Sequence, residues 1–168
     1  MKVHIVLYQP EIPPNTANIM RTCVATKAAL HLIHPLGFDL NYKANELRRS
    51  STNFIDQVEL YEYDSFEEFV AKNNPQNIGL LTRYGKQTYD KLDATAAEDF
   101  YIVFGKESTG IPKEILNQYE NDTFRIPMSE EMRSINLSNC AAMITYELLR
   151  QKNFEGLEMT EPHKVDYI

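Results

Sequence analysis

Residues 101–112 read Tyr-Ile-Val-Phe-Gly-Lys-Glu-Ser-Thr-Gly-Ile-Pro, and this stretch indicates the fold more clearly than any other. Its first four residues form an apolar run, which is typical of a central strand buried on both faces of a parallel sheet. Gly105 and Gly110 in the following loop let the backbone turn tightly and approach a ligand closely. Because α/β sheets bind ligands at the carboxyl ends of their parallel strands, this loop is a candidate binding site.

Outward from this stretch, short β-rich runs alternate with helical stretches, which predicts an α/β sheet with helices on its faces. The other expected strands are 3–8, 31–34, 57–63, 78–82 and 124–126. The expected helices are 15–27, 44–49, 65–72, 112–118 and 136–153. The apolar strand at 78–82 should be central, whereas 57–63 mixes apolar and acidic residues and should lie nearer an edge.

Several of these helices have marked starts. Ser65 and Glu68 form a capping box, and Pro112 suits a first helical position. The last helix is apolar around most of its circumference over three turns, so it must be buried on more than one side. In so small a protein this predicts a subunit partner, and we expect a charge at Ile144 to disrupt a dimer.

The chain of 168 residues fits one domain, 1–168, with a polar and loosely held tail at about 155–168. No apolar run is long enough to span a bilayer, and the first residues leave no room for a signal peptide. Cys23 and Cys140 lack metal-ligand spacing and are expected to be free thiols in a reducing cytosol. We therefore expect a cytoplasmic protein that does not contact membranes.

The net charge of −7 argues against a nucleic-acid partner, because neutralising phosphates requires clustered lysine and arginine. Arg48 and Arg49 are nevertheless adjacent. Further cations fall in or beside the polar loops described next, namely Arg21, Arg83, Lys86, Lys106, Arg125 and Arg133. Net charge thus lowers the expectation of RNA binding without excluding it.

Three polar segments interrupt the alternation of expected strands and helices. Residues 10–23 contain three prolines, and Asn15 or Thr16 is expected to cap the helix that follows, on which Asn18 and Arg21 share a face. Residues 104–112 match neither the dinucleotide fingerprint nor the P-loop. Residues 125–129 and 133–142 hold more polar side chains than one helix cap requires, although Ser134 or Asn136 can serve as that cap. An ordinary cap or βα loop remains the alternative reading of each segment.

Other kinds of site are not indicated. The four histidines have no ligand spacing, and neither a Ser/His/Asp nor a Cys/His arrangement is recognisable. The sequence therefore predicts no metal site.

Taken in order, the three segments resemble those of the SPOUT superfamily of RNA methyltransferases, and the resemblance runs from about residue 6 to residue 150. It is closest to the minimal single-domain group, the TrmL/YibK-like tRNA (cytidine/uridine-34)-2′-O-methyltransferases. The resemblance implies a mostly parallel sheet flanked by helices, with a carboxy-terminal trefoil knot. It also implies a homodimer that uses S-adenosylmethionine, without metal, to methylate a ribose 2′-hydroxyl in the tRNA anticodon stem-loop, and not DNA.

The resemblance also assigns roles to residues. Those matching the family's catalytic motifs are Asn15, Arg21, Glu107, Ser134 and Asn136. Those matching its cofactor site are Leu81, Thr82, Gly105, Ile126, Met128, Ser134 and Leu137. Those expected to touch RNA are Arg48, Arg49 and Arg133. Because an arginine stays protonated, Arg21 is expected to orient the hydroxyl and a neighbouring phosphate rather than to act as the base.

Two departures from the family pattern stand out. Ala17 replaces a usual glycine, which is conservative within a helix. Thr52-Asn53-Phe54 replaces a frequent Leu-Asp-Tyr run, which removes a tyrosine hydroxyl from the possible RNA contacts.

Three alternatives stay open at this point. The chain could methylate another RNA such as rRNA, or it could be a catalytically silent RNA-binding module of the same fold. A Rossmann-type methyltransferase acting on small molecules is disfavoured by the missing glycine fingerprint.

Overall fold

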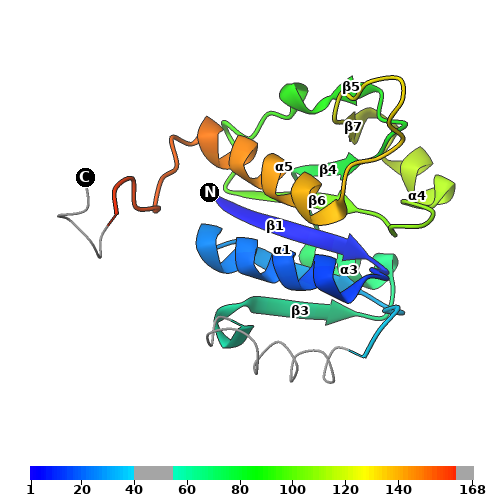
Figure 1. Cartoon of the computed structure of the whole chain (residues 1–168), viewed down its shortest axis with the longest axis horizontal. Coiled ribbons are helices and arrows are strands. Elements are labelled where there is room, and N and C mark those ends of the chain that lie inside the picture. Colours follow the sequence, from blue (N-terminus) through cyan, green and yellow to red (C-terminus); the bar gives the residue numbers. More distant parts are fainter. Residues whose placement is uncertain (40–54, 162–168) are drawn as a thin grey trace.

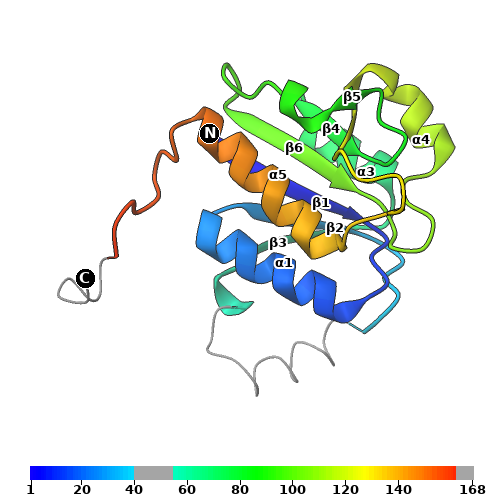
Figure 2. The same ribbon diagram turned by 45° about the horizontal axis from the view of Figure 1, so that its top comes forward.

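The computed structural model describes residues 1–39 and 55–161, which form a parallel sheet with helices on both faces (Figures 1 and 2). The strands are β1 Lys2–Tyr8, β2 Ala29–Ile33, β3 Glu59–Tyr63, β4 Ile78–Leu81, β5 Gln87–Thr88, β6 Asp99–Phe104 and β7 Thr123–Arg125. The helices are α1 Pro13–Thr26, α3 Phe66–Asn73, α4 Lys113–Gln118 and α5 Leu137–Gln151, with short 3₁₀ turns η1 Ile55–Gln57, η2 Tyr89–Lys91 and η3 Glu120–Asp122.

The sheet order is β3-β2-β1-β6-β4-β7-β5, and each neighbouring pair is parallel. Alternate residues of β1 point to opposite faces, as the pleat of a strand requires. Ile5 and Leu7 join a core with α1 and α5, whereas Val6 joins a second core with α3 and α4. Since every strand runs the same way, the loops after β1, β4, β6 and β7 all emerge at one edge of the sheet.

The α/β architecture and the positions of the central and edge strands are confirmed. β6 lies between β1 and β4, and β3 is at an edge. The two-residue strand β5 was not anticipated, because Gln87 and Thr88 give no periodic signal. The expected helix at 44–49 lies outside the described residues. The trefoil knot and the single-domain boundaries stay predictions.

The helix starts were predicted with mixed success. Ser65 accepts from the backbone N–H of Glu68, as expected, and Asn136 caps α5. The expected cap of α1 is wrong. Pro13 and Pro14 occupy its first two positions, and Asn15 lies buried inside the first turn. Pro112 precedes α4 as its N-cap instead of beginning the helix.

The surface of α5 is less apolar than the sequence indicated. Ile144 is fully buried in the core of its own subunit, so its expected place at a subunit interface is wrong. A charge there would disrupt the fold itself. Met143 and Tyr146 on the same helix are 39% and 47% exposed and form its outward apolar surface.

Both cysteines are free thiols, as expected. Burial raises the pKa of Cys23 to about 12 and that of Cys140 to about 11, so both stay protonated near neutral pH. Within residues 1–39 and 55–161, no helix is long and apolar enough to cross a membrane. The same residues contain no cluster of three or more His, Cys, Asp or Glu side chains placed to hold a metal ion.

A row of hydrogen-bonded polar side chains, buried except for Asp99, crosses the sheet on its α3 face. His4 Nε2 contacts Asp99 at 3.2 Å, His4 Nδ1 contacts His31 Nε2 at 2.9 Å, and His31 Nδ1 contacts the Tyr63 hydroxyl at 2.9 Å. One assignment of hydrogens satisfies every contact: Tyr63 donates to His31, His31 to His4 and His4 to Asp99. Both imidazoles are neutral in this assignment, because each ring donates through one nitrogen and accepts through the other.

The hydrogen-bonded row of His4, His31 and Tyr63 predicts that the protein loses stability in mild acid. Burial lowers the pKa of His31 to about 3 from its ordinary 6.5, so below pH 6.5 the unfolded chain binds a proton that the folded chain does not. The free energy of unfolding should therefore decrease as pH falls from 6.5 to 5, by up to about 1.4 kcal/mol per pH unit from this group. Urea titrations of the parent and of His31→Gln at several pH values measure this free energy. The variant should lose less stability per pH unit than the parent, and equal losses would contradict the assignment.

Candidate functional site

The Glu107 carboxylate, in the loop after β6, accepts hydrogen bonds from the loop between β1 and α1. Its Oε2 accepts from the backbone N–H of Glu11 at 2.8 Å. Its Oε1 accepts from the N–H of Ile12 at 3.3 Å and from the side-chain amide of Asn15 at 3.0 Å. α1 has no side-chain cap, and its first two residues are prolines without an N–H. Glu107 therefore holds the helix start through the two residues that precede it and through the Asn15 side chain.

The two loops are bonded in both directions. The Glu11 carboxylate accepts from the backbone N–H of Ser108 and from the Ser108 hydroxyl, each at 2.9 Å. These hydrogen bonds hold the pKa of Glu11 below its ordinary value. We call these reciprocal contacts of Glu11, Glu107 and Ser108, together with Asn15, the carboxylate clamp.

Asn15 extends the clamp to the third polar segment. Its side-chain oxygen accepts from the side-chain amide of Asn136 at 2.9 Å. The Asn136 oxygen in turn accepts from the backbone N–H of Ser138 at 2.9 Å at the start of α5. Asn15 is 5% exposed, so its polar atoms depend on these partners and not on water. One hydrogen-bonded chain therefore connects all three segments.

The loop after β6 is a tight hairpin that requires its glycines. Lys106 and Gly110 exchange backbone hydrogen bonds of 3.2 and 2.9 Å. A Cβ on Gly105 would stand 2.1 Å from the carbonyl carbon of Gly110, and Gly110 itself has a φ of +77°. The close backbone approach expected from the sequence is thus present, with the chain folding onto itself at this point.

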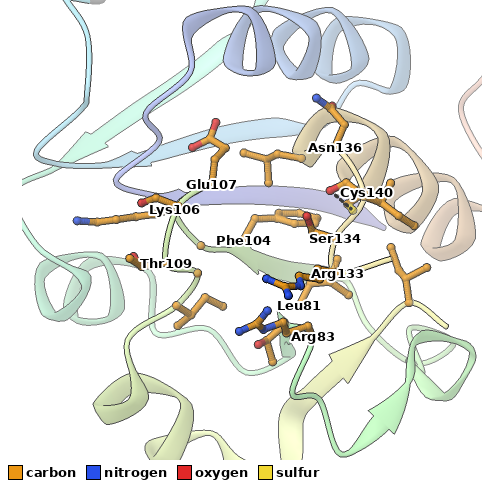
Figure 3. Close-up of a pocket in the computed structure, with 18 of the residues that line it drawn as sticks. Leu81, Arg83, Phe104, Lys106, Glu107, Thr109, Arg133, Ser134, Asn136 and Cys140 are labelled. Atoms are coloured by element: carbon orange, nitrogen blue, oxygen red, sulfur yellow. Dashed lines mark hydrogen bonds between the residues drawn. The ribbon is translucent and has the colours of Figure 1, made fainter. Parts of the chain in front are cut away.

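A cavity of about 400 Å³ opens where these loops meet (Figure 3). Most of the residues assigned to the site from the sequence line it: Asn15, Leu81, Thr82, Gly105, Glu107, Ile126, Met128, Arg133, Ser134, Asn136 and Leu137. It also contains residues not assigned to it from the sequence, among them Arg83, Tyr84, Thr109 and Cys140. Thr109 and Cys140 lie within two of the polar segments found in the sequence, and Arg83 and Tyr84 directly follow Thr82.

Arg21 does not line this cavity. It is exposed on α1, six residues beyond Asn15, which is roughly 9 Å further along the helix axis. Asn18, three residues earlier, is also exposed, so the two share the outer face of the helix. Arg48 and Arg49 lie outside the described residues.

The chain was compared with known proteins. The model of the SpoU rRNA Methylase family matches residues 2–146. A relative from Geobacillus stearothermophilus, provisionally named tRNA (cytidine(34)-2′-O)-methyltransferase, is 46% identical over 158 residues, covering 94% of this chain and 99% of its own. A solved structure from Bacillus anthracis is 45% identical with a TM-score of 0.88, covering 95% of this chain and 99% of its own. Another solved structure, described as concerning 2-OH methylation of C/U34 on tRNA, is 36% identical with a TM-score of 0.79. It covers 91% of this chain and 97% of its own.

The clamp predicts a specific pattern of stability. Glu107→Ala removes the acceptor of three donors and should lower the free energy of unfolding by about 1–3 kcal/mol, whereas Glu107→Gln, which keeps one oxygen, should lose less. Urea denaturation measures both. Glu114→Ala is the matched control, because that exposed glutamate on α4 makes no hydrogen bond or ion pair with the described residues. If Glu107→Ala costs no more than this control, the clamp is not holding the loops.

Proposed function

The chain belongs to the SpoU rRNA Methylase family, and from this premise we propose that it transfers a methyl group from S-adenosylmethionine to a ribose 2′-hydroxyl of tRNA. The proposed target is the wobble nucleotide 34, a cytidine or a modified uridine, in the anticodon stem-loop. One observation carries the proposal. Nearly the whole chain, including the three clamped loops, aligns with relatives whose names refer to 2′-hydroxyl methylation at nucleotide 34 of tRNA.

The cavity suits the proposed cofactor. Its volume falls within the roughly 300–1,000 Å³ common for small-molecule sites. Leu81, Ile126 and Leu137 offer apolar surface for a purine ring, while Thr82, Ser134 and the backbone of the Gly105 hairpin offer polar partners. When bound, S-adenosylmethionine supplies an electrophilic methyl group on its sulfonium.

The residues of the chain would have separate tasks. Arg21, whose guanidinium stays protonated, would orient the ribose hydroxyl and a neighbouring phosphate. Glu107 and Asn15 already use their polar atoms in the clamp, so we assign them to positioning the loops rather than to touching the substrate. Ser134 and Asn136 would fix the edge of the cavity nearest α5.

RNA would meet a locally basic rim on an acidic protein. Arg83 and Arg133 both line the cavity and both are exposed. Splayed anticodon-loop nucleotides present their bases and 2′-hydroxyls for such recognition, which also distinguishes RNA from DNA. The two free thiols agree with a cytoplasmic enzyme.

We further propose that the working form is a homodimer. α1 and α5 pack on the same face of the sheet, and no other helix or strand of the described residues covers their outer sides (Figure 2). Met143 and Tyr146 are exposed there, as is Arg21 on α1. A second copy would cover the apolar side chains and bring Arg21 near a cavity that it does not reach within its own chain.

Methyl transfer from labelled S-adenosylmethionine to bulk tRNA, followed by mass spectrometry of the modified nucleotide, tests the proposed function. We expect 2′-O-methylation at nucleotide 34. Methylation of rRNA instead, or RNA binding without any transfer, would favour the alternatives.

Arg21→Ala should reduce methyl transfer at least about a hundredfold, the usual scale for losing a group that orients reactants. Cofactor affinity, measured by calorimetry, should be unchanged, because Arg21 does not line the cavity of its own chain and its proposed contacts are with RNA. Transfer near the parent rate would remove Arg21 from this role.

Tyr146→Glu should shift the protein towards the monomer in sedimentation velocity, because it places a charge on the proposed interface. Met159→Glu is the control, since that methionine is 72% exposed and lies beyond the end of α5. Equal sedimentation of the two variants and the parent would contradict the interface.

A further inference from the structure

A second cavity of about 690 Å³ adjoins the first. The two share five lining residues, Thr82, Tyr84, Lys106, Thr109 and Ile111. From these the second cavity extends to Tyr8 at the end of β1 and to Lys113 and Leu116 of α4. It therefore lies at the same ligand-binding edge of the sheet, on the side of the α3 and α4 helices.

The second cavity is basic, although the chain carries a net charge of −7. Lys86, Lys106 and Lys113 line it, against a single carboxylate, Glu120, with which Lys86 is paired. Lys106 and Lys113 form no ion pair with the described part of the chain. Two ammonium groups without an ion-pair partner among the described residues, in one concave surface, favour an anionic ligand.

Tyr84 stands at the junction of the two cavities and is 67% exposed. The Arg83 guanidinium lies over its ring, 4.6 Å from the centroid, and also contacts its hydroxyl. An exposed aromatic ring beside lysines is the combination that single-stranded nucleic acids bind: rings stack on bases and ammonium groups neutralise phosphates.

The segment that carries Tyr84 is held rigidly. Thr82 N–H donates to the Phe124 carbonyl at 2.9 Å, and Gly85 N–H donates to the Thr82 carbonyl at 3.1 Å. A Cβ on Gly85 would stand 2.2 Å from the carbonyl carbon of Phe124, so the backbone is pressed against β7. The exposure of Tyr84 thus follows from a fixed turn, so the backbone that carries its ring needs little reorganisation when a base binds.

We propose that the second cavity binds a nucleotide of the substrate RNA next to the methylated one, with its phosphate at Lys106 and Lys113 and its base on the Tyr84 ring. The proposal rests on the proposed function, because it takes the first cavity as the cofactor site and RNA as the substrate. It extends that function by giving the RNA a path from the cofactor cavity towards α4, away from the α1–α5 face.

Binding of a fluorescent anticodon stem-loop RNA, measured by anisotropy across a salt series, tests the proposal on the full-length protein. Lys113→Ala should weaken binding and reduce the salt slope by about one, as expected for one lost phosphate contact. Tyr84→Ala should weaken binding roughly 5- to 150-fold, the range for one lost base stack, whereas Tyr84→Phe should bind like the parent.

Lys91→Ala is the matched control for charge. Lys91 is exposed in η2 beside Leu92, whose carbonyl is bonded to Gln151 at the end of α5 remote from the cavities. Its salt slope should equal that of the parent. Calorimetry with S-adenosylmethionine is run on every variant, and unchanged cofactor affinity is expected for Lys113→Ala.

The outcomes separate the two proposals. If the parent methylates tRNA and both Lys113→Ala and Tyr84→Ala bind RNA like the parent, the second-cavity proposal fails while the proposed function stands. If Lys113→Ala weakens binding of the cofactor instead of RNA, the second cavity belongs to the cofactor and the proposal is overturned. If the parent transfers no methyl group but binds RNA with the predicted losses, the proposed function fails and with it the placement beside a methylated nucleotide, whereas RNA binding in the second cavity stands. If the parent binds no RNA, both fail.

Discussion

The carboxylate of Glu107 is the constraint on which the site depends. Two proline residues open α1 and have no N–H to donate, and this distant side chain accepts from the backbone N–H groups of Glu11 and Ile12 just before the helix. The same carboxylate fixes Asn15, which fixes Asn136, which caps α5. Helix capping and site assembly are thus one hydrogen-bond network, and disturbing either one disturbs the other.

The parallel sheet makes this network possible. Because all strands run the same way, loops separated by about a hundred residues emerge together, and short polar side chains can bridge them. The polar atoms of the clamp form hydrogen bonds within the protein and are therefore not available to a ligand. What remains open to a substrate is the cavity lining beside it, the basic rim with Tyr84, and the outer face of α1 that carries Arg21.

The sequence predicted the architecture well because the apolar runs of β4 and β6 and the glycines of the hairpin are local signals. It also selected half of the residues that line the cavity, because family motifs mark the loops that form it. Contacts between residues distant in the sequence could not be predicted from it. The carboxylate that holds the start of α1 comes from Glu107, 92 residues beyond Asn15, and no local pattern encodes that. The burial of Ile144 depends on the angle at which α5 packs on the sheet. The histidine chain of His4 and His31 depends on strand register, which spacing along the sequence does not show.

The central claim is that the clamp brings three loops together to form one cofactor cavity. A crystal structure with S-adenosylhomocysteine, which lacks only the transferable methyl group, tests it most directly. The account predicts the ligand against Leu81, Gly105 and Ile126, with Glu107 still bonded to the loop before α1. Ligand density at another surface, or a bound state in which Glu107 has left that loop to contact the ligand, would contradict it.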